Sequence, residues 1–165
     1  MKPRLMTLLA PALLCAAVLP AAAQEIVRHK IPGSDFPIAQ AVTLPPNATI
    51  HFISGQVPPV LDKAAAGDSL AAFGNTKQQT VGVLTKIKDV LSGMGLTMGD
   101  VVKMQVFLVG DPTKGGKGDV AGFMEGYTQF FGGAQPNLPA RAVFQVAALS
   151  NPGWLIEIEV VAAKK

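Results

Sequence analysis

The chain has 165 residues, of which 49% are apolar and 15% charged, a length and composition typical of one globular domain with its own core. Its 14 Lys and Arg residues stand against 11 Asp and Glu residues, which argues against the strongly basic surface of a nucleic-acid-binding protein. Cys15 is the sole cysteine, so an internal disulfide and a cluster of thiolate metal ligands are excluded.

Residues 1–23 have the pattern of a cleavable signal peptide. Lys2 and Arg4 give the segment a positive start, residues 5–19 are almost entirely apolar, and three alanines precede Gln24, as at signal-peptidase sites. The apolar run of about 15 residues is too short to span a bilayer comfortably. We therefore expect export to the periplasm, cleavage before Gln24 and no stable membrane anchor.

Cleavage would leave residues 24–165 as a single domain. Because Lys2 and Arg4 would be lost, the count of Lys and Arg would fall from 14 to 12, against 11 acidic residues. This near-neutral domain is not expected to bind nucleic acid. Arg28, in the charged stretch 25–30, is expected to be solvated.

Apolar patterns predict an ordered series of strands and helices in this domain. Strands are expected at residues 25–30, 38–43, 49–54, 100–109, 142–149 and 154–162, and helices at residues 76–94 and 120–131. The first helix begins after Asn75, a good N-cap, and ends before Gly95. Residues 57–67 and 110–119 are expected to be loops, and the glycines of the second loop lack phosphate-binding spacing.

Both helices have one apolar face, which predicts the fold class. The apolar positions are Thr80, Leu84, Ile87, Leu91 and Met94 in the first helix, and Val120, Phe123, Tyr127 and Phe130 in the second. We interpret both faces as core. Two such helices interleaved with half-polar strands indicate an α+β, chorismate-mutase-like fold with a single mixed sheet and both helices packed on one face.

Charged residues in apolar surroundings mark a candidate site near the C-terminus. Arg141 lies in the otherwise apolar segment 138–144, and such an arginine needs a carboxylate from the protein or from a ligand. Glu157 and Glu159 share one face of the last strand; we interpret Glu159 as solvated and Glu157 as the candidate for proton transfer. If the last two strands form a hairpin, Glu157 lies opposite Phe144 and near Arg141, as part of a site or as a simple salt bridge.

The order of several short motifs resembles the RidA/YjgF family, also called the endoribonuclease L-PSP family. The motifs are Ile53-Ser54-Gly55-Gln56, Gly99-Asp100-Val101-Val102-Lys103, Tyr127-Thr128-Gln129-Phe130-Phe131, Pro139-Ala140-Arg141 and Ile156-Glu157-Ile158-Glu159. Each is weak alone, but together they span nearly all of residues 24–165 in the family's order.

The resemblance implies a homotrimer in which each site forms between neighbouring subunits. It implies hydrolysis of reactive 2-imino and enamino acids to 2-keto acids and ammonia, with no metal and no organic cofactor. Arg141 matches the family arginine that holds the substrate carboxylate, and Glu157 matches the glutamate that positions or activates water. Ser54 and Gly55 match residues that line the pocket, and the expected partner is a small imino or keto acid.

The chain departs from the family at three pocket positions. Ile38 stands where the family has a tyrosine, Val143 where it has a cysteine, and Met124 where it has an asparagine. Phe36 is close enough in sequence to Ile38 to supply a ring instead. These exchanges predict a more apolar range of substrates.

Two other functions stay open on the sequence. One is a non-catalytic protein that binds a small carboxylate in the same cleft between subunits. The other is the ribonuclease activity carried in the family's second name, against which the near-neutral charge of residues 24–165 argues.

Overall fold

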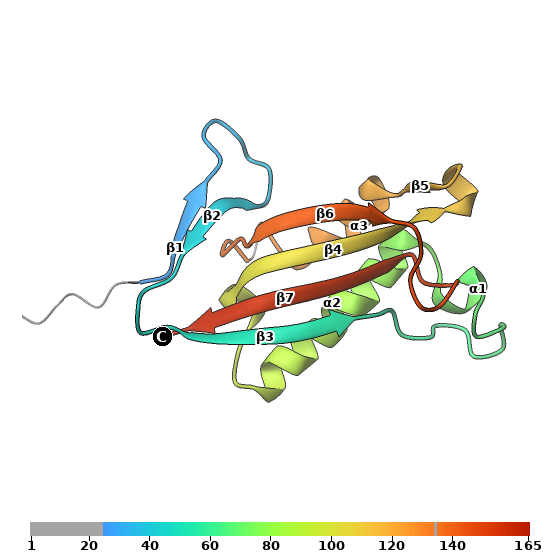
Figure 1. Ribbon diagram of the computed structural model, residues 1–165, viewed down its shortest axis with the longest axis horizontal. Helices are drawn as coiled ribbons and strands as arrows, with labels where there is room; N and C mark the ends of the chain where they lie inside the picture. Colours follow the sequence, from blue (N-terminus) through green and yellow to red (C-terminus); the bar gives the residue numbers. More distant parts are fainter. Residues whose placement is uncertain (1–24, 134) are drawn as a thin grey trace, which may run out of the picture.

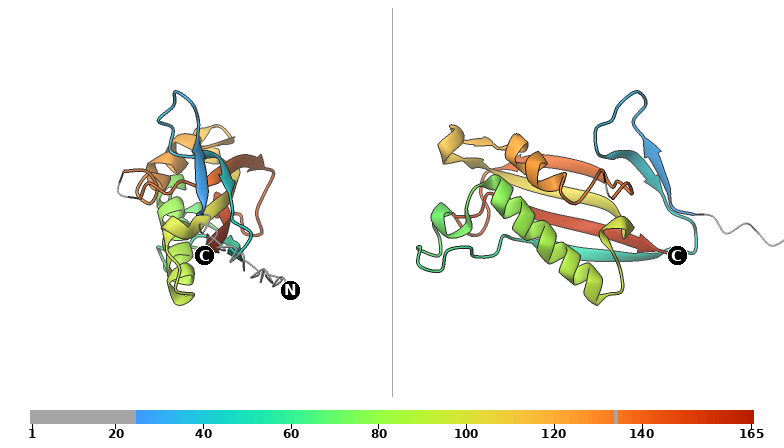
Figure 2. Two further views of the ribbon diagram at one scale, coloured as in Figure 1. Left: turned by 90° about the vertical axis from the view of Figure 1, so that its left-hand side faces the viewer. Right: turned by 180° about the vertical axis from the view of Figure 1, so that it is seen from behind.

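One mixed β-sheet and the helices on one of its faces make up the protein (Figures 1 and 2). The structure is a computed structural model that describes residues 25–133 and 135–165, so the signal peptide expected at residues 1–23 lies outside the described residues. The strands are β1 (Val27–Lys30), β2 (Ala39–Thr43), β3 (Thr49–Gln56), β4 (Val101–Asp111), β5 (Lys117–Gly118), β6 (Ala140–Val146) and β7 (Ile156–Lys164). The helices are α1 (Leu70–Phe73), α2 (Thr76–Gly93) and α3 (Val120–Tyr127), with 3₁₀ turns at Met98–Asp100 and Pro112–Lys114.

The strand order in the sheet is β1-β2-β6-β4-β7-β3, and β5 pairs with the end of β4. Strand β6 runs parallel to β4, while β7 runs antiparallel to both β4 and β3. Strand β2 meets β6 at one pair, Ala39 with Ala140, and the β1–β2 hairpin projects from that end of the sheet (Figure 1). The predicted α+β fold with helices on one face is confirmed.

The predicted hairpin of the last two strands is wrong, because β4 lies between β6 and β7. Phe107 of β4 pairs with Phe144 on one side and Glu157 on the other. Phe144 and Glu157 therefore lie in one row across the sheet, as predicted, but their strands β6 and β7 are not neighbours. Along β4, buried apolar residues alternate with residues that are half-buried or exposed. Its central position in the sheet gives both of its edges a hydrogen-bonded neighbour.

Helix α2 follows the prediction from its first residue. The Asn75 side chain accepts a hydrogen bond from the Gln78 amide at 3.0 Å, and the Gln78 side chain accepts one from the Asn75 amide at 3.0 Å, which makes a capping box. The helix ends at Gly93, and Gly95 has the left-handed φ of 70° expected after a C-cap. Its apolar face packs into the core together with α3, β4 and β7.

Two glycines, one in α2 and one in α3, let neighbouring segments pack closely against α2. A Cβ on Gly82 would stand 2.6 Å from Cδ of Pro59, and one on Gly126 of α3 would stand 2.7 Å from Cβ of Thr80. Real Cβ atoms are not found at such distances, so the two glycines allow the loop and α3 to approach α2. Gly82 therefore permits close packing in the middle of α2.

Four local features differ from the sequence predictions. Helix α1 was not predicted, and residues 110–119 contain β5, which pairs Gly118 with Gly110 of β4. Helix α3 ends at Tyr127, and the next residues form a turn that places the Phe131 ring 4.9 Å from the Tyr127 ring. Arg28 is half-buried rather than solvated, because its Nη2 donates a hydrogen bond to the Gly99 carbonyl at 2.7 Å.

Among the described residues, no helix is long and apolar enough to cross a membrane.

Candidate functional site

Arg141 projects from β6 toward α3 into a group of aromatic rings. Its Cζ lies 4.2 Å from the ring centroid of Tyr127, 5.0 Å from that of Phe123 and 5.5 Å from that of Phe36. Its Nη2 donates to the sulfur of Met124 at 3.3 Å. Aromatic faces and a thioether stabilise a cation only weakly when compared with a carboxylate.

Within residues 25–133 and 135–165, Arg141 makes no salt bridge, and its buried Nη1 has no hydrogen-bond partner. Burial lowers the pKa of Arg141, and the nearby Tyr127 opposes that shift. A guanidinium nevertheless stays charged in proteins. A buried cation with an unused donor is costly unless an anion completes its hydrogen bonds. The site therefore has the chemistry of a receptor for a small anion.

The loop between β1 and β2 is fixed beside this guanidinium. The Tyr127 hydroxyl donates a hydrogen bond to the Pro37 carbonyl at 2.8 Å, and burial raises the pKa of Tyr127 to about 12. The Tyr127 side chain is fully buried, whereas Phe36 is 47% exposed. This hydrogen bond thus anchors the segment that carries Phe36 over Arg141.

A cavity of about 460 Å³ opens beside Arg141. It lies where β2 diverges from β6, and it is lined by Ile31, Ile38, Ala39, Gln40, Lys103, Met104, Ala140, Arg141 and Ala142. The structure thereby brings together two of the residues singled out in the sequence, Ile38 and Arg141. We call Arg141, Ile38, Phe36 and Met124 the arginine group.

Glu157 lies on β7 against the backbone of β3. Its neighbours Ile156 and Ile158 belong to the core beneath the helices, so Glu157 faces the other side of the sheet. The β3–β7 register shifts between Ile53 and Gln56. At this irregularity, a Cβ built on Gly55 would overlap Oε1 of Glu157.

Only glycine at position 55 therefore leaves room for the carboxylate. One predicted pocket residue, Gly55, thus lies against Glu157, and its neighbour Ser54 lines a cavity together with Glu159. We call Ser54, Gly55 and Glu157 the glutamate group.

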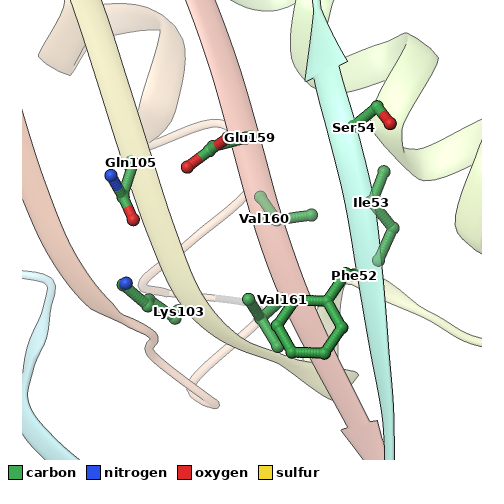
Figure 3. A pocket seen from close by; sticks show the side chains of 8 residues that line it. All are labelled: Phe52, Ile53, Ser54, Lys103, Gln105, Glu159, Val160 and Val161. Carbon is green, nitrogen blue, oxygen red and sulfur yellow. The ribbon is translucent and has the colours of Figure 1, made fainter.

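A second cavity, of about 400 Å³, lies on the sheet face away from the helices (Figure 3). Lys103, Gln105 and Glu159 contribute its polar side chains from β4 and β7, and Ser54, Ile53 and Phe52 border it from β3. Glu159 is half-buried here rather than fully solvated. The cavity adjoins the glutamate group through Ser54.

In one subunit the arginine group and the glutamate group do not meet. Arg141 contacts α3 on the helix-covered face, whereas Glu157 lies on the opposite face, so the expected proximity of the two residues within the chain is wrong. Val143, the predicted pocket residue on β6, packs against the core under the helices.

Sequence reasoning assigned Phe123 and Tyr127 to the core alone and missed that they also form the wall beside Arg141. The available signal was Tyr127, the one tyrosine of the chain, in an otherwise apolar stripe. A buried tyrosine usually has a hydrogen-bond partner for its hydroxyl.

Several known proteins are similar to the chain over most of its length. The family model described as Endoribonuclease L-PSP matches residues 33–164. A RutC family protein of Pyrococcus abyssi is 31% identical over 146 residues, which cover 87% of this chain and 99% of that protein. The 2-iminobutanoate/2-iminopropanoate deaminase of Capra hircus is 34% identical over 82% of this chain and 85% of its own. YyfB of Yersinia pestis, described as a Rid family protein, has a similar fold, with a TM-score of 0.61 and 23% identity over 86% of this chain and 100% of that one.

Proposed function

The chain belongs to the RidA/YjgF family, and from this premise we propose that it hydrolyses reactive 2-imino and enamino acids to 2-keto acids and ammonia. The observation that carries the proposal is Arg141, a half-buried cation whose Nη1 has no partner among the described residues and which borders a cavity. A planar guanidinium binds a carboxylate through two parallel hydrogen bonds. The substrate carboxylate would supply the missing acceptors.

Glu157 is the residue we assign to the hydrolytic step. As the oxygen of a water molecule attacks C2 of the imine, the Glu157 carboxylate accepts a proton from that water and returns it to the former imine nitrogen, which gives a carbinolamine. The carbinolamine hydroxyl proton then passes to the same nitrogen through Glu157, the C2–N bond breaks, ammonia leaves and the C2 carbonyl forms. One imine and one water therefore give one keto acid and one ammonia, and an enamine enters the same route after it tautomerises to the imine.

We propose that each site forms between neighbouring subunits of a homotrimer. Arg141 and Glu157 lie on opposite faces of the sheet, so one chain alone does not present both to a single ligand. The face that carries Glu157 also exposes large apolar side chains, among them Ile50, Phe144 and Phe52, which is 82% exposed. Contact with a second copy would cover this face and would place the glutamate group of one subunit beside the arginine group of the next.

Export to the periplasm remains part of the proposal and rests on the pattern of residues 1–23. An exported enzyme of this kind would act on imines that arise outside the cytoplasm, for example from the oxidation of amino acids there. Expression of the natural chain followed by N-terminal sequencing of the periplasmic protein would test the predicted cleavage before Gln24.

The activity can be measured by generating 2-iminopropionate in place with an amino-acid oxidase and trapping the surviving imine with semicarbazide. We expect the purified protein to reduce the trapped imine, and Arg141→Ala and Glu157→Ala to abolish this effect. Glu159→Gln, a change two residues along the same face of β7, is the matched control and should retain activity. If no imino acid is lost faster with the protein than without it, the function is that of a carboxylate-binding protein instead.

A further inference from the structure

The cavity beside Arg141 has a mainly apolar wall. Its apolar lining comes from three strands and the β1–β2 loop, namely Ile31, Ile38, Ala39, Met104, Ala140 and Ala142. Apart from Arg141, its polar side chains are Gln40 and Lys103, and both are exposed to solvent. A ligand in this cavity thus meets the half-buried Arg141, the exposed Lys103 and an apolar surface that offers few hydrogen bonds.

Phe36 adds a half-exposed ring to the same guanidinium. The Tyr127 hydroxyl fixes the adjacent Pro37 carbonyl at 2.8 Å, and the Ile38 amide donates to the Phe36 carbonyl at 2.7 Å. The backbone that carries the ring is therefore held in place before any ligand binds. A rigid aromatic surface provides contact area at little cost in conformational entropy.

We infer that the site takes 2-imino acids with bulky apolar side chains, branched aliphatic or aromatic, in preference to 2-iminopropionate. The inference rests on the proposed function and names the substrate class of that site. In a 2-imino acid the side chain and the carboxylate are attached to the same carbon. A ligand held at Arg141 by its carboxylate therefore begins its side chain two bonds away, next to the apolar wall.

Burial of apolar surface sets the size of the expected preference. Each buried methylene group strengthens binding by about fourfold. The isobutyl side chain of a leucine-derived ligand has three carbons more than the methyl group of pyruvate, which corresponds to roughly tenfold to fiftyfold tighter binding when burial is nearly complete.

The test compares binding of the stable 2-keto acid products with turnover of the corresponding imino acids. Pyruvate, 4-methyl-2-oxopentanoate and phenylpyruvate are titrated into the purified protein by calorimetry, and the rates for the imino acids derived from alanine, leucine and phenylalanine are measured with the semicarbazide trap. Ile38→Thr keeps a β-branched residue next to β2 but makes the cavity wall polar, and we expect it to reduce the preference for the large ligands by about fivefold. Val90→Thr, on the exposed side of α2, is the matched control and should change nothing.

The outcomes separate this inference from the proposed function. Tighter binding of both large keto acids, weakened in Ile38→Thr alone, supports the inference. Equal or tighter binding of pyruvate overturns the inference, and so does a preference for the large keto acids that Ile38→Thr leaves intact. In either case, turnover of 2-iminopropionate by the same preparation still supports the deaminase proposal. If no imino acid is hydrolysed, the deaminase proposal fails, and the keto-acid titrations still decide which side chains the cavity accepts.

Discussion

Arg141 and Glu157 lie on opposite faces of one sheet, although their strands both flank the central strand β4. Strand β4 separates their strands, and the Arg141 guanidinium is directed at α3 while Glu157 is directed away from the helices. A site that uses both side chains on one ligand therefore needs two chains. This relationship makes the subunit arrangement testable without a structure of the oligomer.

Mixed trimers of two inactive variants should regain activity. When Arg141→Ala and Glu157→Ala chains are assembled together at equal amounts, about three quarters of the trimers contain both, and each of these has one intact site out of three. We expect about one quarter of the wild-type rate per chain, measured with the imine trap after co-expression under two affinity tags.

The control is the same pair of variants mixed after each has assembled alone, which should stay inactive for as long as subunits do not exchange. Doubly tagged trimers that remain inactive would contradict a site shared between subunits. A monomer in sedimentation at micromolar concentration would contradict the trimer itself.

Gly55→Ala should impair catalysis while sparing ligand binding. A methyl group at position 55 would overlap Oε1 of Glu157, so the carboxylate must move, and a displacement of about 1 Å can cost about a hundredfold in rate. Arg141 is untouched, and the affinity for the keto acid should stay within about twofold by the same reasoning. The measurements are kcat for the imino acid and Kd for the keto acid.

Gly67→Ala is the control for this change, because a Cβ there meets nothing within 4 Å. It should leave both kcat and Kd at their wild-type values. A Gly55→Ala protein with normal kcat would show that the position of the Glu157 carboxylate does not limit the reaction.

The packing of α3 on α2 predicts opposite effects for two glycine substitutions. Gly126→Ala would place Cβ 2.7 Å from Cβ of Thr80 and 3.1 Å from the Lys77 carbonyl, and such overpacking costs about 1–3 kcal/mol. Gly93, in the exposed last turn of α2, has nothing within 4 Å of a built Cβ. Gly93→Ala should therefore increase the free energy of unfolding by up to about 1 kcal/mol through helix propensity.

Urea unfolding of both variants and the wild type would measure these changes. A stabilised Gly126→Ala protein would mean that α2 and α3 can separate without loss. The pair also controls for the general effect of adding a methyl group to a helical glycine.

The sequence predicted what depends on local pattern and missed what depends on distant pairing. Helix α2 was predictable because its apolar spacing and the Asn75 cap lie within one segment. The insertion of β4 between β6 and β7 was not, because hydrophobic alternation gives the buried face of a strand but not its neighbour. For the same reason Arg28 was expected in solvent, although the Gly99 carbonyl, far away in sequence, accepts its hydrogen bond.

The candidate site also has one part that the sequence could predict and one part that it could not. Arg141, Glu157, Gly55 and Ile38 could be singled out by residue type and family resemblance. Their separation into two groups on opposite faces could not, since it follows from strand order. Periodicity likewise gave the buried face of α3 but not the arginine that lies against it.

Titration of Tyr127 should make the stability depend on pH in the alkaline range. Burial raises the pKa of this phenol from 10.0 to about 12. Between these values the unfolded chain has lost the proton that the folded chain retains, so the free energy of unfolding falls as the pH rises. The full shift corresponds to about 2–3 kcal/mol; the contribution is fully present below about pH 10 and is lost by about pH 12.

Tyr127→Phe isolates this contribution because the chain has no other tyrosine. At about pH 9 the variant should be less stable than the wild type by about 1 kcal/mol, since the hydrogen bond to the Pro37 carbonyl is lost. As the pH rises toward about 12, the unfolded wild type ionises its phenol while the folded wild type does not, so the wild type loses about 2–3 kcal/mol that the variant does not lose. The two unfolding free energies should therefore meet near about pH 11 and cross, and the variant should be the more stable protein at about pH 12. Phenolate absorbance of the folded wild type would locate the same ionisation directly. A wild-type phenol that titrates near its ordinary pKa, with parallel stability curves for the two proteins, would contradict the buried hydrogen bond and the anchoring of Phe36 that depends on it.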